Sequence, residues 1–537
     1  MSLRRGVMAG GVALGLMAGL TAAAFAALVV TAAGHGGESG LATAYVGRVV
    51  RFTLLQALAS TLLSVIPAMI VARALARRPV FVGRRLVLRL FALPLALPAI
   101  VAVLGVVEIW GRQGLVNRAA EALGLAPVID IYGLAGILIA HVFFNLPLAT
   151  RLFLGALDRV PGESWRLAAQ LGFDGTAVWR QIEWPVLKAQ LPAVAGLVFM
   201  LCIASFTVVL TLGGGPRATT IEVAIYQALR FDFDPGLAVR LALMQLALTG
   251  ALVLAGVRMT QPMDVGAGLD RAVPRPDGAT AGARLGDALM IGVALVVTLP
   301  VFAAILVAGL NAPLAHLAGD AGVWRAGATS LAIASAAAIL SLAMAWPLGE
   351  LAASGRQPSA GRRLRLAGRS AEMASSLVLV MPPVVLGAGW FVLLLGVPGG
   401  RDLGFAVVIA INALMAVPFI MRVLATAIND SRTRHDRLCA SLGISGLARL
   451  RLIDWPVLRR PLAVAAAFAL ALSLGDLGAI ALFGSEHLVT LPLLLLQRLG
   501  SYRVDDAAGL ALVLGALCLA IMALAERTAR RDSGVVT

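Results

Sequence analysis

Charged and sulfur-containing side chains are scarce in this chain of 537 residues. Charged residues make up 13% of it and cysteines number three, whereas hydrophobic residues reach 60%. A soluble domain typically has about 25% charged and about 45–50% apolar residues, so the composition excludes a water-soluble protein of this size. Cys202, Cys439 and Cys518 lie far apart and show no CxxC or Cys/His spacing, so we expect neither a disulfide framework nor a metal site.

Lysine is almost absent. Lys188 is the one lysine, so arginine supplies nearly all of the basic excess behind the net charge of +16. Such a charge is also found in nucleic-acid-binding proteins, but here the arginines are separated by apolar runs. That pattern is typical of cytoplasmic loops between membrane helices. We therefore expect no nucleic-acid partner and a chain embedded in a lipid bilayer.

Apolar runs of about 20 residues, the length that crosses a bilayer as a helix, recur along the chain. The first follows Arg4 and Arg5 and is too long for the apolar region of a signal peptide. The sequence therefore predicts an all-α, polytopic membrane protein with about 12 transmembrane helices. The runs lie at residues 7–33, 50–74, 88–110, 133–153, 190–212, 236–258, 286–311, 326–351, 374–397, 404–427, 461–483 and 507–526.

The twelve runs form two sets of six around a polar segment rich in Gly, Pro and Asp. This composition is typical of a linker, and predicts a first membrane domain at 1–259, a cytoplasmic linker at 260–284 and a second membrane domain at 285–537.

The two sets repeat one another with a constant separation of 271 positions. Six helices per set make the repeat parallel, with both halves entering the membrane in the same direction. The matching pairs include Gly133 with Gly404, Pro147 with Pro418, Arg151 with Arg422, Gly172 with Gly443, and the run Trp184-Pro-Val-Leu187 with Trp455-Pro-Val-Leu458.

Orientation follows from the arginines, most of which fall in alternate loops. The positive-inside rule places these loops, and with them both termini, in the cytoplasm. The opposite loops carry acids instead: Glu38, Asp130, Asp232, Asp234, Asp320, Glu486, Asp505 and Asp506.

The long cytoplasmic loop between the fourth and fifth helices of each half carries the most informative motif. It consists of a short segment of small and apolar residues, a glycine suited to positive φ, an amphipathic stretch and then a proline that begins the next helix. A protruding loop of this kind is suited to contact a partner protein. Its residues are Arg166, Ala168, Ala169, Gly172 and Pro185 in the first half, and Arg437, Ala440, Gly443 and Pro456 in the second.

These loops resemble the EAA loops of type I ABC importer permeases, whose short coupling helix docks on a cytoplasmic ATPase. The usual Glu of the motif is replaced by Arg166 and Arg437, and the next residue is Leu in both loops. The resemblance implies two copies of an ATPase subunit, a periplasmic solute-binding protein and a bacterial inner-membrane location. No Walker motif is present, so ATP hydrolysis would belong to the partner.

Fused permeases of this length are similar to the thiamine and the ferric-iron importers. Residues 111–229 resemble the thiamine and thiamine pyrophosphate branch, notably at 111–114, 132–147, 167–172, 183–185 and 212–229. The resemblance implies thiamine and its phosphates as solutes. A ferric-iron or other small-solute permease is the alternative.

Three polar residues within apolar runs are candidates for the solute path. His141 and Asn145 lie four residues apart on one helical face, although hydrogen bonding between helices is the commoner use of such residues. Asp476 is a carboxylate inside a spanning run, where an acid is costly and predicts function by default. Its alternative role is to pair with a neighbouring helix.

Two other classes of function are alternatives to an ATP-driven importer. A secondary transporter also has twelve helices in two halves, but it couples to ions through intramembrane acids, and Asp476 alone is thin support. A membrane enzyme requires paired acids, a metal cluster or a nucleophile with its base. We find none of these, and expect no catalytic residue and no cofactor.

Overall fold

The computed structural model describes residues 3–34, 40–125, 130–213, 215, 218–259, 275–278, 280–357, 360–444, 446–486 and 488–530. Over these residues the protein is built from helices and contains no strand. Eleven helices among them are long and apolar enough to cross a membrane. The predicted all-α, polytopic architecture is confirmed. Glu38 and most of the predicted linker lie outside the described residues.

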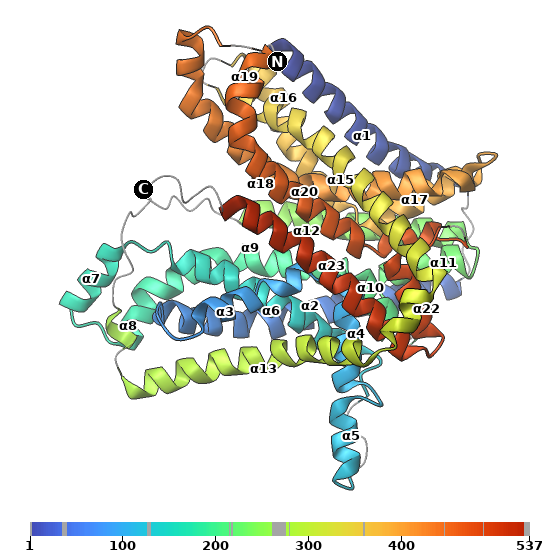
Figure 1. The fold of residues 1–537 in the computed structure, drawn as a ribbon, viewed down its shortest axis with the longest axis horizontal. Helices are drawn as coiled ribbons and strands as arrows, with labels where there is room; N and C mark the ends of the chain where they lie inside the picture. Colours follow the sequence, from blue (N-terminus) through green and yellow to red (C-terminus); the bar gives the residue numbers. More distant parts are fainter. Residues whose placement is uncertain are drawn as a thin grey trace.

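The helices of the first half are α1 to α12 and those of the second half are α13 to α23 (Figure 1). The first half contains α1 (Leu3–Gly34), α2 (Gly40–Arg77), α3 (Arg84–Leu90), α4 (Ala99–Trp110), α5 (Leu115–Ala122), α6 (Leu134–Leu157), α7 (Gly162–Gln170), α8 (Gly175–Val178), α9 (Trp184–Ile203), α10 (Phe206–Leu212), α11 (Ile221–Arg230) and α12 (Pro235–Met259). The second half contains α13 (Ala281–Asn311), α14 (Leu314–Gly319), α15 (Ala321–Gly355), α16 (Arg362–Leu377), α17 (Pro383–Leu395), α18 (Gly404–Ser441), α19 (Gly446–Arg449), α20 (Trp455–Gly475), α21 (Gly478–Phe483), α22 (Leu491–Gly500) and α23 (Val504–Arg530).

The third predicted span of each half is shorter than the sequence indicates. Helix α17 has 13 residues, and the continuous helix predicted at 374–397 is therefore wrong. Helix α4 has 12 residues and reaches spanning length only together with α5. Proline explains both breaks, because Pro98 precedes α4 and Pro382 precedes α17, and proline disfavours helical backbone in the residue before it.

The fifth predicted span of each half is broken near its end. Helix α9 stops at Ile203 and α10 resumes at Phe206, while α20 stops at Gly475 and α21 resumes at Gly478. The breaks lie at matching positions of the repeat, with Ser205 in one and Asp476 in the other. Discontinuous membrane helices expose backbone and polar groups at membrane depth, where transporters place solutes.

The first helix of each half packs against the other half. Helix α1 contacts α15 and α17, and α13 contacts α2 and α4. Figure 1 shows α1 lying along α15 and α16, while α13 runs beneath the helices of the first half. One buried apolar cluster accordingly draws on both halves, from Leu28 of α1 to Leu348 of α15. The halves are therefore interlocked.

Candidate coupling loops and solute cavity

The first loop has the predicted order of a short helix, a glycine turn and a proline-started helix. Helix α7 carries Arg166, Ala168 and Ala169, and only Ala168 of these is buried. Gly172 follows with a φ of +66°, so the predicted left-handed turn is confirmed. A short π-helix (Trp179–Glu183) then leads into α9, whose first turn contains the exposed Pro185.

The second loop keeps the turn but not the separate helix. Arg437 and Ala440, both exposed, lie on the last turns of α18, which runs unbroken for 38 residues. Gly443 has a φ of +62°, and a π-helix (Leu450–Asp454) leads into α20 and its exposed Pro456. The difference has a local cause: Pro161 caps α7, whereas Arg432 stands at that repeat position and continues the helix.

Each loop presents a pair of exposed leucines, four residues apart, at the end of the helix that precedes its glycine turn. Leu167 and Leu171 are 55% and 60% exposed, and Leu438 and Leu442 are 51% and 63% exposed. The pairs match at the repeat separation of 271 positions. Residues four apart lie on the same face of a helix, so each loop has a small exposed apolar patch beside its glycine turn.

Buried ion pairs connect the first loop to residues 275–278, which lie within the predicted linker. Glu183, whose side chain is fully buried, accepts hydrogen bonds from Arg73 Nε (2.5 Å) and from Arg275. The Arg275 guanidinium also lies 4.1 Å from the centre of the Trp165 ring and pairs with Asp277 at 3.1 Å. A buried charge requires such partners, because desolvation costs several kcal/mol per ion.

The second loop is held by its own, more exposed ion pairs. Arg432 pairs with Glu350 of α15, and Arg449 donates to Asp436 at 2.7 Å and lies 3.4 Å from Asp454. Burial lowers the pKa of Arg449, but the hydrogen bond to Asp436 and the charge of Asp454 outweigh this effect, so its pKa is raised.

His141, Asn145 and Asp476, the three predicted path residues, line one cavity of about 310 Å³. The cavity lies where the two halves meet, at the breaks in both fifth helices. Its lining residues from the first half include Pro94, His141, Phe144, Asn145, Ser205, Phe206 and Glu222, and those from the second half include Pro383, Asp476 and Gly478.

His141 and Asn145 make the hydrogen bonds to neighbouring segments that were the alternative to a path role, whereas Asp476 bonds to backbone groups next to it in the chain and not to a Ser or Arg of a neighbouring helix. His141 lies between two hydroxyls, with Nδ1 2.8 Å from Ser60 Oγ and Nε2 2.8 Å from Ser205 Oγ. Asn145 donates from Nδ2 to Cys202 Sγ at 3.3 Å. Asp476 accepts from the backbone N–H groups of Gly478 and Ala479, both at 3.2 Å, and so caps α21.

Glu222 lines the same cavity and was missed by the sequence analysis. It lies in the first turn of α11, within a stretch too short to be read as a membrane span. Its carboxylate is buried: Gln245 Nε2 lies 3.5 Å from Oε1, and Oε2 has no partner within the described part of the chain. The sequence signal that could have identified Glu222 is an acid within a mostly apolar stretch.

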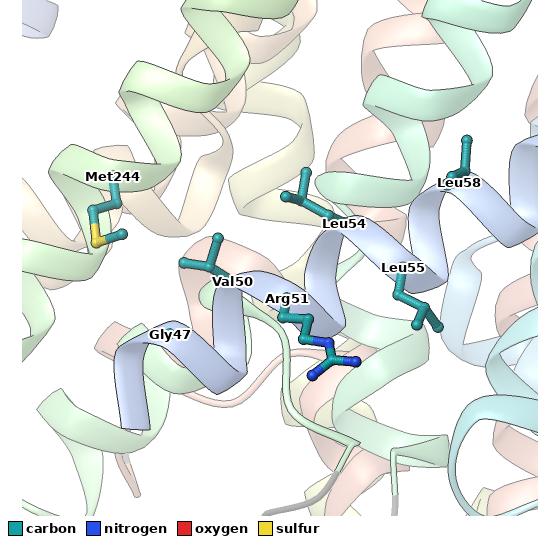
Figure 2. Close-up of a pocket in the computed structure, with 7 residues that line it drawn as sticks. All are labelled: Gly47, Val50, Arg51, Leu54, Leu55, Leu58 and Met244. Carbon is teal, nitrogen blue, oxygen red and sulfur yellow. The ribbon is translucent and has the colours of Figure 1, made fainter. Parts of the chain in front are cut away.

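A second hollow, of about 560 Å³, has a different chemistry. Figure 2 shows Val50, Arg51, Leu54, Leu55 and Leu58 along α2, with Met244 of α12 across from them. Apart from Arg51 its lining is apolar or glycine. Such a surface suits lipid chains rather than a polar solute.

Several curated proteins are similar to this chain over almost its whole length, although no family model matches it. It is 52% identical to the thiamine transport system permease protein ThiP of Brucella abortus, over 97% of this chain and 95% of that protein. It is 45% identical to ThiP of Escherichia coli, over 91% and 90% of the two chains. A shorter match, 31% identical over 38% of this chain, is to the molybdenum transport system permease protein ModB of Mycobacterium bovis. The chain belongs to the family of thiamine transport system permease proteins.

Proposed function

We propose that this protein is the membrane subunit of an ATP-driven importer that carries thiamine and its phosphates across the bacterial inner membrane. The full-length similarity to ThiP carries the proposal, because it extends through both halves and both loops. The interlocked halves, with a cavity at their junction, suit a pathway that opens when the halves move relative to one another.

The two loops are the elements we assign to ATPase coupling. Each ends a helical segment with a left-handed glycine and presents two exposed leucines, so a partner's groove can close on small and apolar side chains. The roles of Arg166, Ala168, Ala169, Gly172 and Pro185, and of Arg437, Ala440, Gly443 and Pro456, follow from this assignment. Because the two loops are similar, we expect each to bind one copy of the ATPase subunit.

On the other side of the membrane we place a periplasmic solute-binding protein. Helix α5 projects from the bundle in Figure 1 and carries exposed Leu115. A projecting helix with exposed apolar residues suits contact with a protein that delivers the solute. From there the solute would reach the cavity lined by His141, Asn145 and Asp476.

The test is uptake by a defined complex. The chain should be reconstituted in proteoliposomes with its ATPase and binding protein, and the uptake of labelled thiamine and of ferric iron measured separately. We expect thiamine uptake that requires ATP and stimulates its hydrolysis. Uptake of iron in place of thiamine would show that the protein is a ferric-iron permease. Uptake without the ATPase would indicate a secondary transporter.

A further inference from the structure

We propose that Glu222 and Asp476 form a subsite, shared between the two halves, that binds the positively charged ring of an aromatic organic cation in the cavity. The inference rests on the proposed function, because it takes the cavity as the route of the solute. It adds which group of the solute the cavity would recognise and which two residues would bind it, one of them, Glu222, absent from the sequence predictions.

The acidic side chains that line the cavity have no basic counterpart in the described part of its lining. Among its described lining residues, Glu222 and Asp476 are acidic and none is Lys or Arg. His141 is held between the hydroxyls of Ser60 and Ser205, so its ring nitrogens are already occupied. Two carboxylates at membrane depth are costly unless a positive charge approaches them. A cationic solute would supply that charge transiently.

The two carboxylates are held in place by different means. The backbone N–H of Ile221 donates to Thr53 Oγ1 at 3.0 Å, which fixes the start of α11 and the position of Glu222 beside it. Asp476 is fixed by the two N–H groups that it caps. Glu222 retains a buried oxygen, Oε2, without a partner among the described residues. This oxygen is the available acceptor.

The remaining lining favours a flat, aromatic cation. Phe144 and Phe206 both border the cavity. The ring of Phe206 is further supported by Tyr226, whose ring centre is 5.4 Å away in an edge-on arrangement. Aromatic faces attract cations within about 6 Å of the ring centre. Carboxylates together with phenyl rings are the groups expected around a thiazolium or a similar heteroaromatic cation.

The experiment compares a cation with a neutral molecule of the same shape. Thiamine and an isostere in which thiophene replaces the thiazolium ring are titrated against the purified permease–ATPase complex in nanodiscs, without the binding protein. We expect thiamine to bind at least about tenfold more tightly, and Glu222→Gln and Asp476→Asn each to remove most of that preference. The preference is the ratio of the affinities for thiamine and for the isostere, both measured on the same sample. Partial misfolding lowers the amount of active protein for both ligands and therefore does not change this ratio.

Two control variants sharpen the comparison. Glu222→Asp keeps the charge and should keep much of the preference. Asp402→Asn removes an exposed acid between α17 and α18, away from the cavity lining, and should leave the preference unchanged. Equal binding of both probes by the unaltered complex, absence of thiamine binding, or a preference that survives both cavity substitutions would overturn the subsite. Thiamine uptake in proteoliposomes is measured independently, so uptake without a preference rejects the subsite alone.

Discussion

Gly172 and Gly443 occupy backbone conformations that other residues rarely adopt. Their φ angles are +66° and +62°, and a Cβ built on either would meet no atom within 4 Å. The requirement for glycine is therefore conformational and not steric. Each turn follows directly after a helical segment with exposed leucines, so its backbone conformation affects how that segment would meet a partner.

Replacing Gly172 or Gly443 with Val should impair coupling while leaving membrane insertion intact. A β-branched residue in the left-handed region costs roughly 1–3 kcal/mol, and about 1.4 kcal/mol is a tenfold change in an equilibrium. We expect each variant to weaken ATPase co-purification and solute-stimulated ATP hydrolysis by roughly tenfold.

Asparagine is the matched control at both positions, because it tolerates positive φ better than other residues with a Cβ. Gly172→Asn and Gly443→Asn should retain most of the coupling. Unchanged assembly and hydrolysis in both Val variants would contradict the coupling role.

At the scale of elements, the loops differ more than their sequences indicate. One segment is the separate helix α7 and the other is the end of α18, yet both present leucines at matching positions. This divergence is explained by one repeat position, where Pro161 precedes α7 and Arg432 lies within the continuous helix α18. Shared residues define the repeat, whereas the difference between the two loops depends on one position where the halves carry different residues.

The exposed leucines should be required for ATPase binding but not for folding. We expect Leu167→Asp and Leu438→Asp each to lower ATPase co-purification severalfold, because a charge in an apolar contact must be desolvated without a partner. Thermal unfolding of the isolated permease should change little, since surface substitutions usually alter stability by less than about 0.5 kcal/mol.

Leu123→Asp, at a 77% exposed position after α5, is the control for surface charge. Equal loss of ATPase with this control would show that the effect is not specific to the loops.

At the scale of the whole molecule, the long apolar runs and their repeat predicted most of the fold. They could not predict the exchange of α1 and α13 between halves, because apolar helix faces do not encode which neighbour they meet. The sequence also did not predict the helix breaks at Ser205 and at Asp476, since neither residue is proline. The sequence marks Glu222 only as an acid in an otherwise apolar stretch, because Asp476, with which it lines the cavity, lies 254 positions further along the chain.

The arginine distribution predicts both termini in the cytoplasm, and reporter fusions test this directly. A fusion at Asp320, which begins α15, should report the outer side, and one at Arg363, near the start of α16, the cytoplasm. The control is a fusion at Arg166, which should agree with Arg363. Labelling of Asp320 and Arg363 on the same side would contradict the topology.

The exchange of first helices also constrains how the protein is made. Helix α1 leaves the ribosome before α15 and α17, and the first of these partner helices begins only at Ala321. At ~5–20 residues per second, tens of seconds of translation separate the two. During that interval α1 must remain in the lipid without those neighbours. Its continuous apolar surface is therefore a requirement of biosynthesis as well as of the finished transporter.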